Sequence, residues 1–272
     1  MSPSSPSYAF GSGDDAAQRL LVLADVFEPA MAALLSTLPR RQWPVVVDLG
    51  CGPGSSTAHL ARLLDIDQLI GLDSAVSFIG LAETRVPAAT FVLTDVTSGS
   101  WPVPPADLIY TRFLLAHLPD PFTWLGRWRE RLSPGGILLV EETERIETDL
   151  PVFSEYLSLV DGLVASRGGA ALLGADLAAM STDGMSTDGI SIEGATINRP
   201  FELDVTVADA ATMFTLNLRS WRADPWIVAQ RSPYEIDSLA DELADLRDGV
   251  TVGGSIRWTL RQLAVASATP PA

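Results

Sequence analysis

Apolar residues along this chain fall into short continuous runs that alternate with stretches of helical spacing. Val45 to Leu49 is a β-branched apolar run of the kind that forms strands buried on both faces of a parallel sheet. Similar runs predict strands at 69–72, 90–93, 107–110 and 137–141. Helices are predicted at 55–65, 75–85 and 121–132, between the first and second, second and third, and fourth and fifth strands. This alternation predicts a doubly wound α/β sheet, with a ligand crevice at the carboxyl ends of the strands.

The flanking segments depart from this rhythm. Residues 14–38 carry apolar positions at helical spacing, which indicates one or two amphipathic helices before the sheet. After the fifth strand, the pattern predicts two helices within 151–180, extended structure at 190–206, helices at 208–222 and 233–247, and a last strand at 255–265. We expect the last strand to join the sheet antiparallel, and residues 151–180 to cover the crevice as a helical lid.

These patterns predict an α/β fold with a Rossmann-like, mostly parallel sheet and a helical insertion. We expect a flexible segment at 1–13, helices and a ligand-binding core at 14–150, a lid at 151–200, and closing helices and strand at 201–272.

Charge and cysteine content narrow the function. The 272 residues carry a formal net charge of −16, which disfavours binding to nucleic acid or to an anionic membrane surface and favours a small neutral or cationic ligand. An acidic surface that serves solubility alone is the alternative. The single cysteine, Cys51, rules out an internal disulfide or a cysteine-based metal site, and we expect a cytoplasmic protein without a membrane span or metal. A homodimer is left open.

The first strand leads into a glycine-rich turn, Asp48-Leu49-Gly50-Cys51-Gly52-Pro53-Gly54-Ser55. Such a turn lets the backbone approach a ligand and presents free N–H groups at the start of a helix. A dinucleotide fingerprint would place its third glycine at position 55, where this chain has serine. The absence of lysine from the whole chain excludes a P-loop of the usual type.

The run Val-Asp-Leu-Gly-Cys-Gly-Pro-Gly resembles the first motif of class I S-adenosylmethionine-dependent methyltransferases. Further segments resemble later motifs of that family in the same order: Gly71-Leu72-Asp73-Ser74, Thr94-Asp95-Val96, residues 106–121 and residues 132–142. The resemblance implies S-adenosylmethionine as the cofactor.

The expected cofactor site follows these motifs. Asp73 ends the second strand, where a carboxylate can accept hydrogen bonds from ribose hydroxyls, and Ser74 follows it. The resemblance implies that Asp95 and the Val96 N–H meet the adenine. It also places Tyr8 and Arg19 near the methionine carboxylate. The remaining expected cofactor-binding residues are those of the glycine turn and the fourth strand end: Asp48, Gly50, Cys51, Gly52, Gly54, Thr111 and Arg112.

Candidate catalytic and acceptor-binding residues are fewer. His117 follows the fourth strand and could act as a general base, although a structural histidine bonded to the backbone is the alternative. Tyr156, Trp221 and Arg222 are candidates for binding the acceptor, since aromatic and cationic groups are available there.

We therefore expect methyl transfer to an O, N or C atom of a small-molecule acceptor, a bacterial secondary metabolite, by positioning for in-line attack. The alternative is a protein that binds the cofactor without methyl transfer, for regulation or for another reaction. A nicotinamide-dependent oxidoreductase is disfavoured by Ser55 and Asp95.

Overall fold

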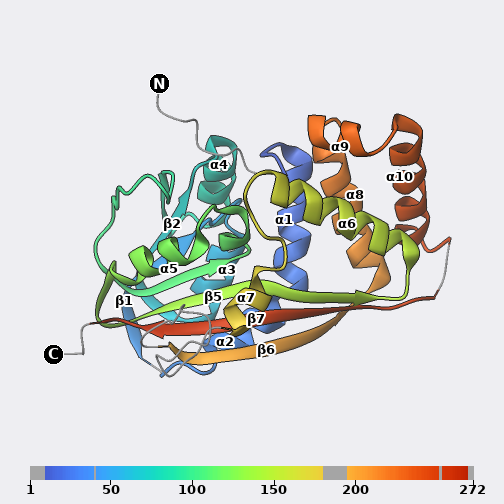
Figure 1. The fold of residues 1–272 in the computed structure, drawn as a ribbon. Coiled ribbons are helices and arrows are strands. Elements are labelled where there is room, and N and C mark those ends of the chain that lie inside the picture. The colour runs from blue at the N-terminus through green and yellow to red at the C-terminus, as the bar shows by residue number, and fades with distance from the viewer. Residues whose placement is uncertain (1–9, 40, 180–194, 251–252, 269–272) are drawn as a thin grey trace.

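A seven-stranded sheet in the order β3-β2-β1-β4-β5-β7-β6 forms the centre of the molecule (Figure 1). The computed structural model describes residues 10–39, 41–179, 195–250 and 253–268. Strand β7 is antiparallel to both of its neighbours, and the other pairs are parallel, which confirms the predicted sheet. The strands are β1 (Gln42–Leu49), β2 (Asp65–Asp73), β3 (Thr90–Leu93), β4 (Ala106–Arg112), β5 (Leu132–Thr148), β6 (Ala195–Val205) and β7 (Ile256–Ala266).

Side chains of the central strands alternate between two covered faces. Val46 and Tyr110 share a cluster with Met31 of α2 (Glu28–Leu35) and Leu60 of α3 (Ser55–Leu63). Their neighbours along the strands, Val47 and Ile109, face the opposite cluster, which holds Trp128 of α5 (Pro121–Arg129) and residues of α7 (Leu173–Ala179). Helix α4 (Val76–Arg85) lies beside β2 and β3, and the short 3-10 helix η1 (Leu115–His117) follows β4. The runs without polar alternation are therefore buried on both faces.

Strands β5, β6 and β7 extend past the rest of the sheet and carry a group of helices at one end of the molecule (Figure 1). We call these helices the cap: α1 (Asp14–Val26), α6 (Pro151–Ser166), α8 (Val207–Trp221), α9 (Pro225–Gln230) and α10 (Pro233–Arg247). Side-chain caps fix the starts of three of them, because Thr206, Asp224 and Ser232 accept hydrogen bonds from backbone N–H groups of the first turn.

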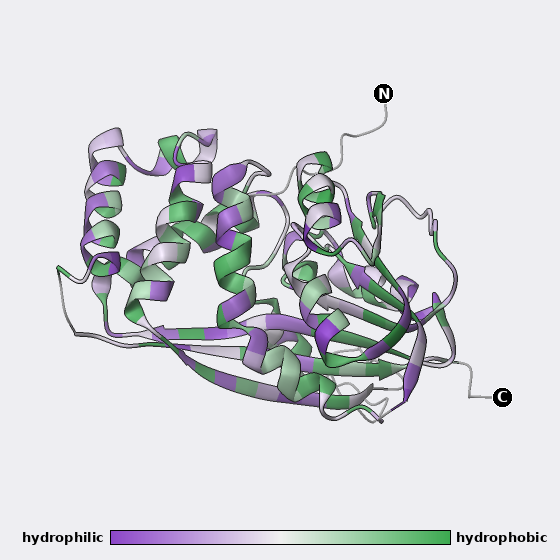
Figure 2. Cartoon of the chain, turned by 180° about the vertical axis from the view of Figure 1, so that it is seen from behind, coloured by the Kyte–Doolittle hydropathy of each residue, from purple (hydrophilic) through white to green (hydrophobic). Residues whose placement is uncertain are grey.

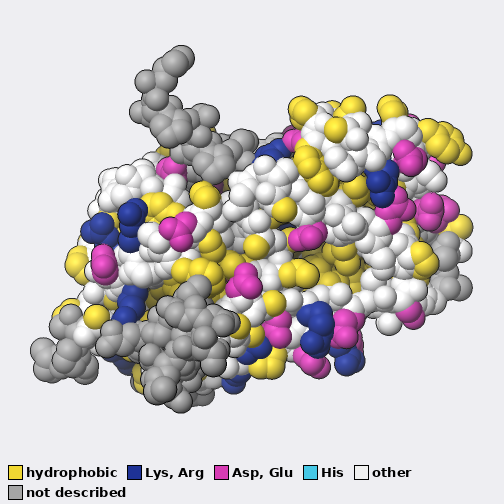
Figure 3. Space-filling model, in the orientation of Figure 1, with side chains coloured by type: hydrophobic (Ala, Val, Ile, Leu, Met, Phe, Trp, Pro, Cys, Tyr) yellow, Lys and Arg dark blue, Asp and Glu magenta, His cyan; other side chains and the backbone are white. Residues whose placement is uncertain are grey.

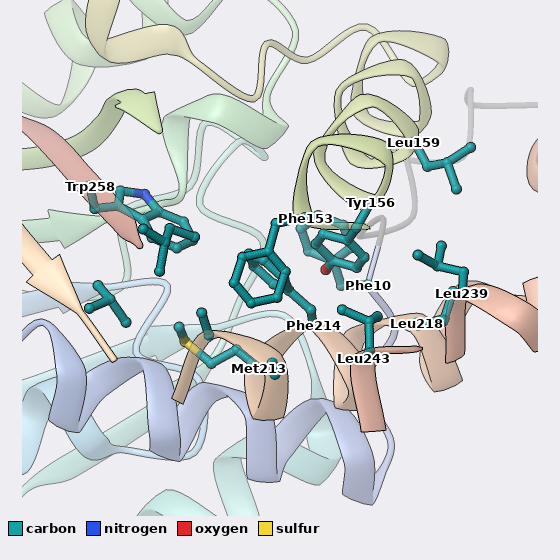
Figure 4. Packing of buried hydrophobic residues seen from close by; sticks show 14 of the residues in the cluster. Phe10, Phe153, Tyr156, Leu159, Met213, Phe214, Leu218, Leu239, Leu243 and Trp258 are labelled. Carbon is teal, nitrogen blue, oxygen red and sulfur yellow. The ribbon is translucent and has the colours of Figure 1, made fainter. Parts of the chain in front are cut away.

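The cap has its own apolar core, shown in Figure 4. Phe214 of α8 stacks on Tyr156 of α6, with ring centroids 4.1 Å apart, and meets Phe153 edge-on at 5.0 Å. Trp258 of β7 joins the same cluster from the sheet side. Figure 2 shows that the cap helices carry hydrophobic and hydrophilic residues on the same helix, as expected for helices with one buried face.

The helices expected over the crevice differ from those found there. Residues 151–180 do form two helices, but α7 packs on the sheet, where a Cβ at Gly174 would lie 2.7 Å from the Glu144 nitrogen. Only α6 of that segment belongs to the cap, which draws its other helices from the chain before β1 and after β6. Within the described ranges, no helix combines the length and apolarity that crossing a bilayer requires.

Candidate active site

A cavity of about 480 Å³ lies between the carboxyl ends of the central strands and the cap. One side is formed by the glycine turn and by residues following β2 and β3, and the other by side chains of α6, α8 and the ends of β5 and β7. Its volume lies in the range of roughly 300–1,000 Å³ that is typical of ligand pockets.

The glycine turn between β1 and α3 lines this cavity. Gly50 and Gly52 have φ angles of +67° and +52°, which disfavour residues with a side chain. The N–H groups of Gly50 and Cys51 both donate to the Leu72 carbonyl, so the turn is fastened to the end of β2. A Cβ at Gly52 would lie 3.3 Å from Leu20 of α1. The turn therefore lines the cavity with backbone atoms and lies close to α1.

Asp73 stands at the junction of the turn and β2. Its Oδ2 accepts from the Gly52 N–H at 2.9 Å and its Oδ1 from the Ala75 N–H at 2.8 Å. Burial raises its pKa above the usual aspartate value, and the backbone hydrogen bonds oppose this shift. A carboxylate has about four lone-pair sites, so two backbone donors leave capacity for hydroxyl groups in the cavity that Asp73 lines. This arrangement fits a ribose diol.

Asp95 and Val96 follow β3 and line the same cavity. Asp95 Oδ1 accepts from the Thr97 N–H at 2.8 Å and from the Thr97 hydroxyl at 2.6 Å, which fixes the loop after the strand. Ser74 lines the cavity between this loop and the glycine turn.

Asp48 has the strongest local constraints. Its side chain is 1% exposed, and its Oδ2 accepts from the hydroxyls of Ser56 and Thr57, each at 2.7 Å. Burial raises its pKa to about 6, because the two hydroxyl donors offset only part of the desolvation. These bonds fasten the end of β1 to the start of α3 and so position the glycine turn.

Two arginines line the cavity close to aromatic rings. Arg19 of α1 is buried, with its guanidinium carbon 5.1 Å from the centroid of the Phe10 ring. Arg112 donates to the Phe27 carbonyl at 3.1 Å and lies 5.7 Å from the Phe113 ring. Both arginines line the cavity, and their binding of the cofactor stays a prediction.

His117 also lines the cavity, and its ring meets Phe10 edge-on at 5.1 Å. Burial, together with the positive charges of Arg19 and Arg167, lowers its pKa to about 3. The imidazole is therefore neutral at physiological pH and is a weak proton acceptor.

Four predicted site residues within the described ranges do not line the cavity. Gly54 begins α3 and abuts α4, where a Cβ would lie 2.9 Å from the Ala82 Cα. The Thr111 side chain is fully buried outside the cavity. Trp221 packs in the cap core, and exposed Arg222 pairs with Asp237. Neither residue is therefore placed to bind an acceptor in this cavity, contrary to the prediction. Tyr8 lies outside the described residues.

The remaining candidates share this one cavity, and the sequence reasoning missed others. The predicted residues that line it are Arg19, Asp48, Gly50, Cys51, Gly52, Asp73, Ser74, Asp95, Val96, Arg112, His117 and Tyr156. Glu142, Asn217 and the Trp258 ring line its cap side without having been predicted. Glu142 had a recognisable signal as an acid directly after an apolar strand, whereas Asn217 was hidden within a helical pattern.

Glu142 is fully buried at the end of the central part of β5. Its Oε1 accepts from the Leu115 N–H at 2.8 Å, and its Oε2 has no hydrogen-bond partner in the part of the chain that the structure describes. Burial raises its pKa to about 8, against the lowering effect of backbone donors in η1. The carboxyl group is therefore largely protonated at neutral pH. No cluster of three or more potential metal-ligand side chains occurs in the described ranges.

Comparison with known proteins gives matches to methyltransferases. Residues 46–136 match the family model described as "Methyltransferase domain". Curated trans-aconitate 2-methyltransferases are similar to the chain. The protein from Methylobacterium radiotolerans is 37% identical over 149 residues, covering 52% of this chain and 57% of its own length. The protein from Rhizobium leguminosarum bv. trifolii is 38% identical over 114 residues, covering 42% and 44%. The chain thus spans about half the length of these relatives.

Solved structures share the fold over nearly the whole chain. The cyclopropane synthase MmaA2 from Mycobacterium tuberculosis has a TM-score of 0.57 at 15% identity and covers 96% of this chain and 99% of its own. A putative methyltransferase from Bacillus halodurans has a TM-score of 0.54 at 13% identity, with coverage of 90% and 100%. The methyltransferase domain matched over residues 46–136, the sheet order and the glycine turn together support a class I S-adenosylmethionine-dependent methyltransferase.

Proposed function

We propose that this protein transfers a methyl group from S-adenosylmethionine to an O, N or C atom of a small molecule. The observation that carries the proposal is the continuity of the cavity. It joins the glycine turn, Asp73 and Asp95 on one side to an apolar chamber under the cap on the other. A cofactor and an acceptor would therefore meet within one enclosed space.

The residues around the strand ends fit the cofactor's functional groups. Asp73 has acceptor capacity for ribose hydroxyls. Asp95, Val96 and Arg19 line the same cavity. We propose that Asp95 and the Val96 N–H bind the purine and that Arg19 binds the carboxylate. When bound, S-adenosylmethionine supplies a methyl group activated by its sulfonium. We propose that the bare backbone of Gly50 and Gly52 lets the methionine end lie close to β1.

The protein itself would orient the cofactor and the acceptor and keep water away from them. Holding two reactants in a productive orientation can supply roughly 7–11 kcal/mol in favourable cases. We propose that the cap limits the access of water to a cavity whose far side is apolar. We propose that His117 acts as a neutral hydrogen-bonding partner near the reacting groups, because its lowered pKa makes it a poor base.

The identity of the acceptor is a further proposal. The similar curated proteins are named for trans-aconitate, which makes that tricarboxylic acid the first compound to test. We propose a secondary metabolite as the natural acceptor and a cytoplasmic location, and these two proposals rest on the expectations from the sequence.

Calorimetry with S-adenosylhomocysteine tests the cofactor site. We expect Asp73→Ala to weaken binding by about 100-fold, because two charge-assisted hydrogen bonds to the ribose would be lost. Asp67→Ala is the matched control, since Asp67 is an exposed aspartate on the same strand. Absence of binding to the wild type at millimolar ligand, or equal affinity of the Asp73 variant, would contradict the proposal.

Methyl transfer itself needs a second measurement. Transfer of an isotopically labelled methyl group to an acceptor panel, followed by mass spectrometry of the products, should give at least one methylated product. Tight binding of S-adenosylhomocysteine with no product across the panel would favour a cofactor-binding protein that performs no methyl transfer.

A further inference from the structure

The side of the cavity remote from the glycine turn is walled by apolar side chains. They come from the residue after β4 and from β5, β7, α6 and α8, and comprise Phe113, Ile146, Trp258, Val160, Leu157 and Phe214. In Figure 4, Phe214 and Trp258 are seen from close by, with Tyr156 reaching towards Phe214 from α6. Large aromatic and aliphatic surfaces of this kind bind apolar molecules by burying area.

Charge on this side of the cavity has one sign. Within the described ranges, α6, α8 and β5 contribute Glu142 and Asp161 to the lining and no arginine. The lining arginines in those ranges, Arg19 and Arg112, lie on α1 and at the end of β4, against Phe10 and Phe113. A carboxylate held against α6 and α8 would therefore find no cationic partner on those helices, and burying an unpaired carboxylate is costly.

A polar group of the chamber still needs a hydrogen bond. Asn217 of α8 is buried, and its Nδ2 donates to the Tyr156 hydroxyl at 2.7 Å. Its Oδ1 has no hydrogen-bond partner among the residues that the structure describes. Because Asn217 lines the cavity, a ligand O–H or N–H group could reach that oxygen and remove the penalty of an unsatisfied buried acceptor.

We propose that the acceptor is an uncharged, largely apolar molecule that donates a hydrogen bond from a hydroxyl or N–H group to Asn217. This inference rests on the methyl transfer proposed above. It sets the acceptor of this chain apart from a tricarboxylate, because the lining arginines of the described residues, Arg19 and Arg112, are those expected at the cofactor, and α6, α8 and β5 add none.

Three probe molecules test the chemistry of the chamber directly. Binding of naphthol, methylnaphthalene and trans-aconitate to the complex with S-adenosylhomocysteine is measured by calorimetry. We expect naphthol to bind at least tenfold more tightly than trans-aconitate. Methylnaphthalene, which matches naphthol in size but lacks the donor, should bind about fivefold more weakly than naphthol, as for the loss of one hydrogen bond.

Substitution of the amide assigns the hydrogen bond. Asn217→Leu should weaken the binding of naphthol by about fivefold and leave the affinity for methylnaphthalene unchanged. Thr215→Val is the matched control, because the Thr215 hydroxyl is buried and unpartnered in the described structure but lies outside this cavity. The naphthol and methylnaphthalene comparison in the wild type stands by itself should the Asn217 variant fail to fold.

The outcomes separate this inference from the proposed function. Trans-aconitate binding as tightly as naphthol, or no binding of either aromatic probe, overturns the apolar acceptor while binding of S-adenosylhomocysteine leaves the cofactor site intact. An equal loss of both aromatic probes in Asn217→Leu overturns the assigned hydrogen bond. A protein that does not bind S-adenosylhomocysteine contradicts the proposed function and this inference together.

Discussion

Glu142 is a buried carboxyl group whose proton is retained far above the usual range. Its pKa is raised from 4.5 to about 8 by burial. The folded state therefore holds a proton that the unfolded state releases near pH 4.5. The contribution of this group to the free energy of unfolding is highest below that pH and falls as the pH rises towards 8.

Glu142→Gln should remove this dependence on pH. The difference in free energy of unfolding, variant minus wild type, should increase by an amount on the order of 3 kcal/mol between about pH 5 and about pH 8. Urea denaturation at both pH values measures this difference. Glu83→Gln, on the exposed surface of α4, controls for the loss of one carboxyl group. Parallel stability curves for Glu142→Gln and the wild type would show that the buried acid is ionised normally.

At the residue scale, the part of the site that depends on backbone geometry was predictable. Gly50 and Gly52 belong to one short motif and Asp73 to another, each recognisable from its local sequence. The parallel register of β1 and β2 brings the two motifs together. The acceptor side was not predictable in this way. Which face of α8 meets the cavity depends on how α1 and α6 pack against it, and a helical pattern does not distinguish Asn217, which lines the cavity, from Trp221, which does not.

At the scale of elements, close contact between α6 and α9 holds part of the cap together. A Cβ at Gly162 of α6 would lie 2.2 Å from the Trp226 ring of α9. The absence of a side chain at this position lets the indole lie directly on the helix backbone. The position is thus fixed by packing rather than by backbone conformation.

Gly162→Ala should therefore lower the free energy of unfolding by about 1–2 kcal/mol, since displacement of the indole outweighs the better helix propensity of alanine. Gly80→Ala in α4 is the matched control, because a Cβ there meets nothing within 4 Å. That control should be more stable than the wild type by about 0.5–1 kcal/mol. Urea denaturation of both variants checks the opposite signs, and a stabilised Gly162→Ala would refute the packing argument.

The order and type of elements could be predicted because local patterns decide them. Strand β3 and helix α10 lie at the predicted positions, and the closing strand is antiparallel as expected. The length of β5 was not predictable, since its outer half, which includes Glu144 and Arg145, alternates in charge and is held by pairing with β7. The cap depends on that extension, and so its membership was also beyond the sequence pattern.

At the scale of the whole molecule, the acidic charge acts on stability. The net charge is −16, and on the face shown in Figure 3 basic side chains lie next to acidic ones. Exposed pairs such as Arg257 with Asp204 contribute little individually. Repulsion among the many unpaired acids therefore dominates the long-range electrostatics.

Stability should consequently rise when salt screens this repulsion. Increasing the ionic strength from about 0.01 M to about 0.15 M shortens the screening length from about 30 Å to about 8 Å. We expect the urea midpoint to increase over this range, with the same direction in sodium chloride and potassium chloride. A decrease would mean that attractive ion pairs outweigh the net charge.

The cap helices come from three separate segments of the chain, before β1, after β5 and after β6. Loss of any one of these segments would leave the others without packing partners, since α8 contacts both α1 and α10. A new acceptor preference could therefore hardly arise in this lineage through gain or loss of a whole module. It would have to come by exchange of individual side chains along the chamber wall, with the glycine turn left untouched.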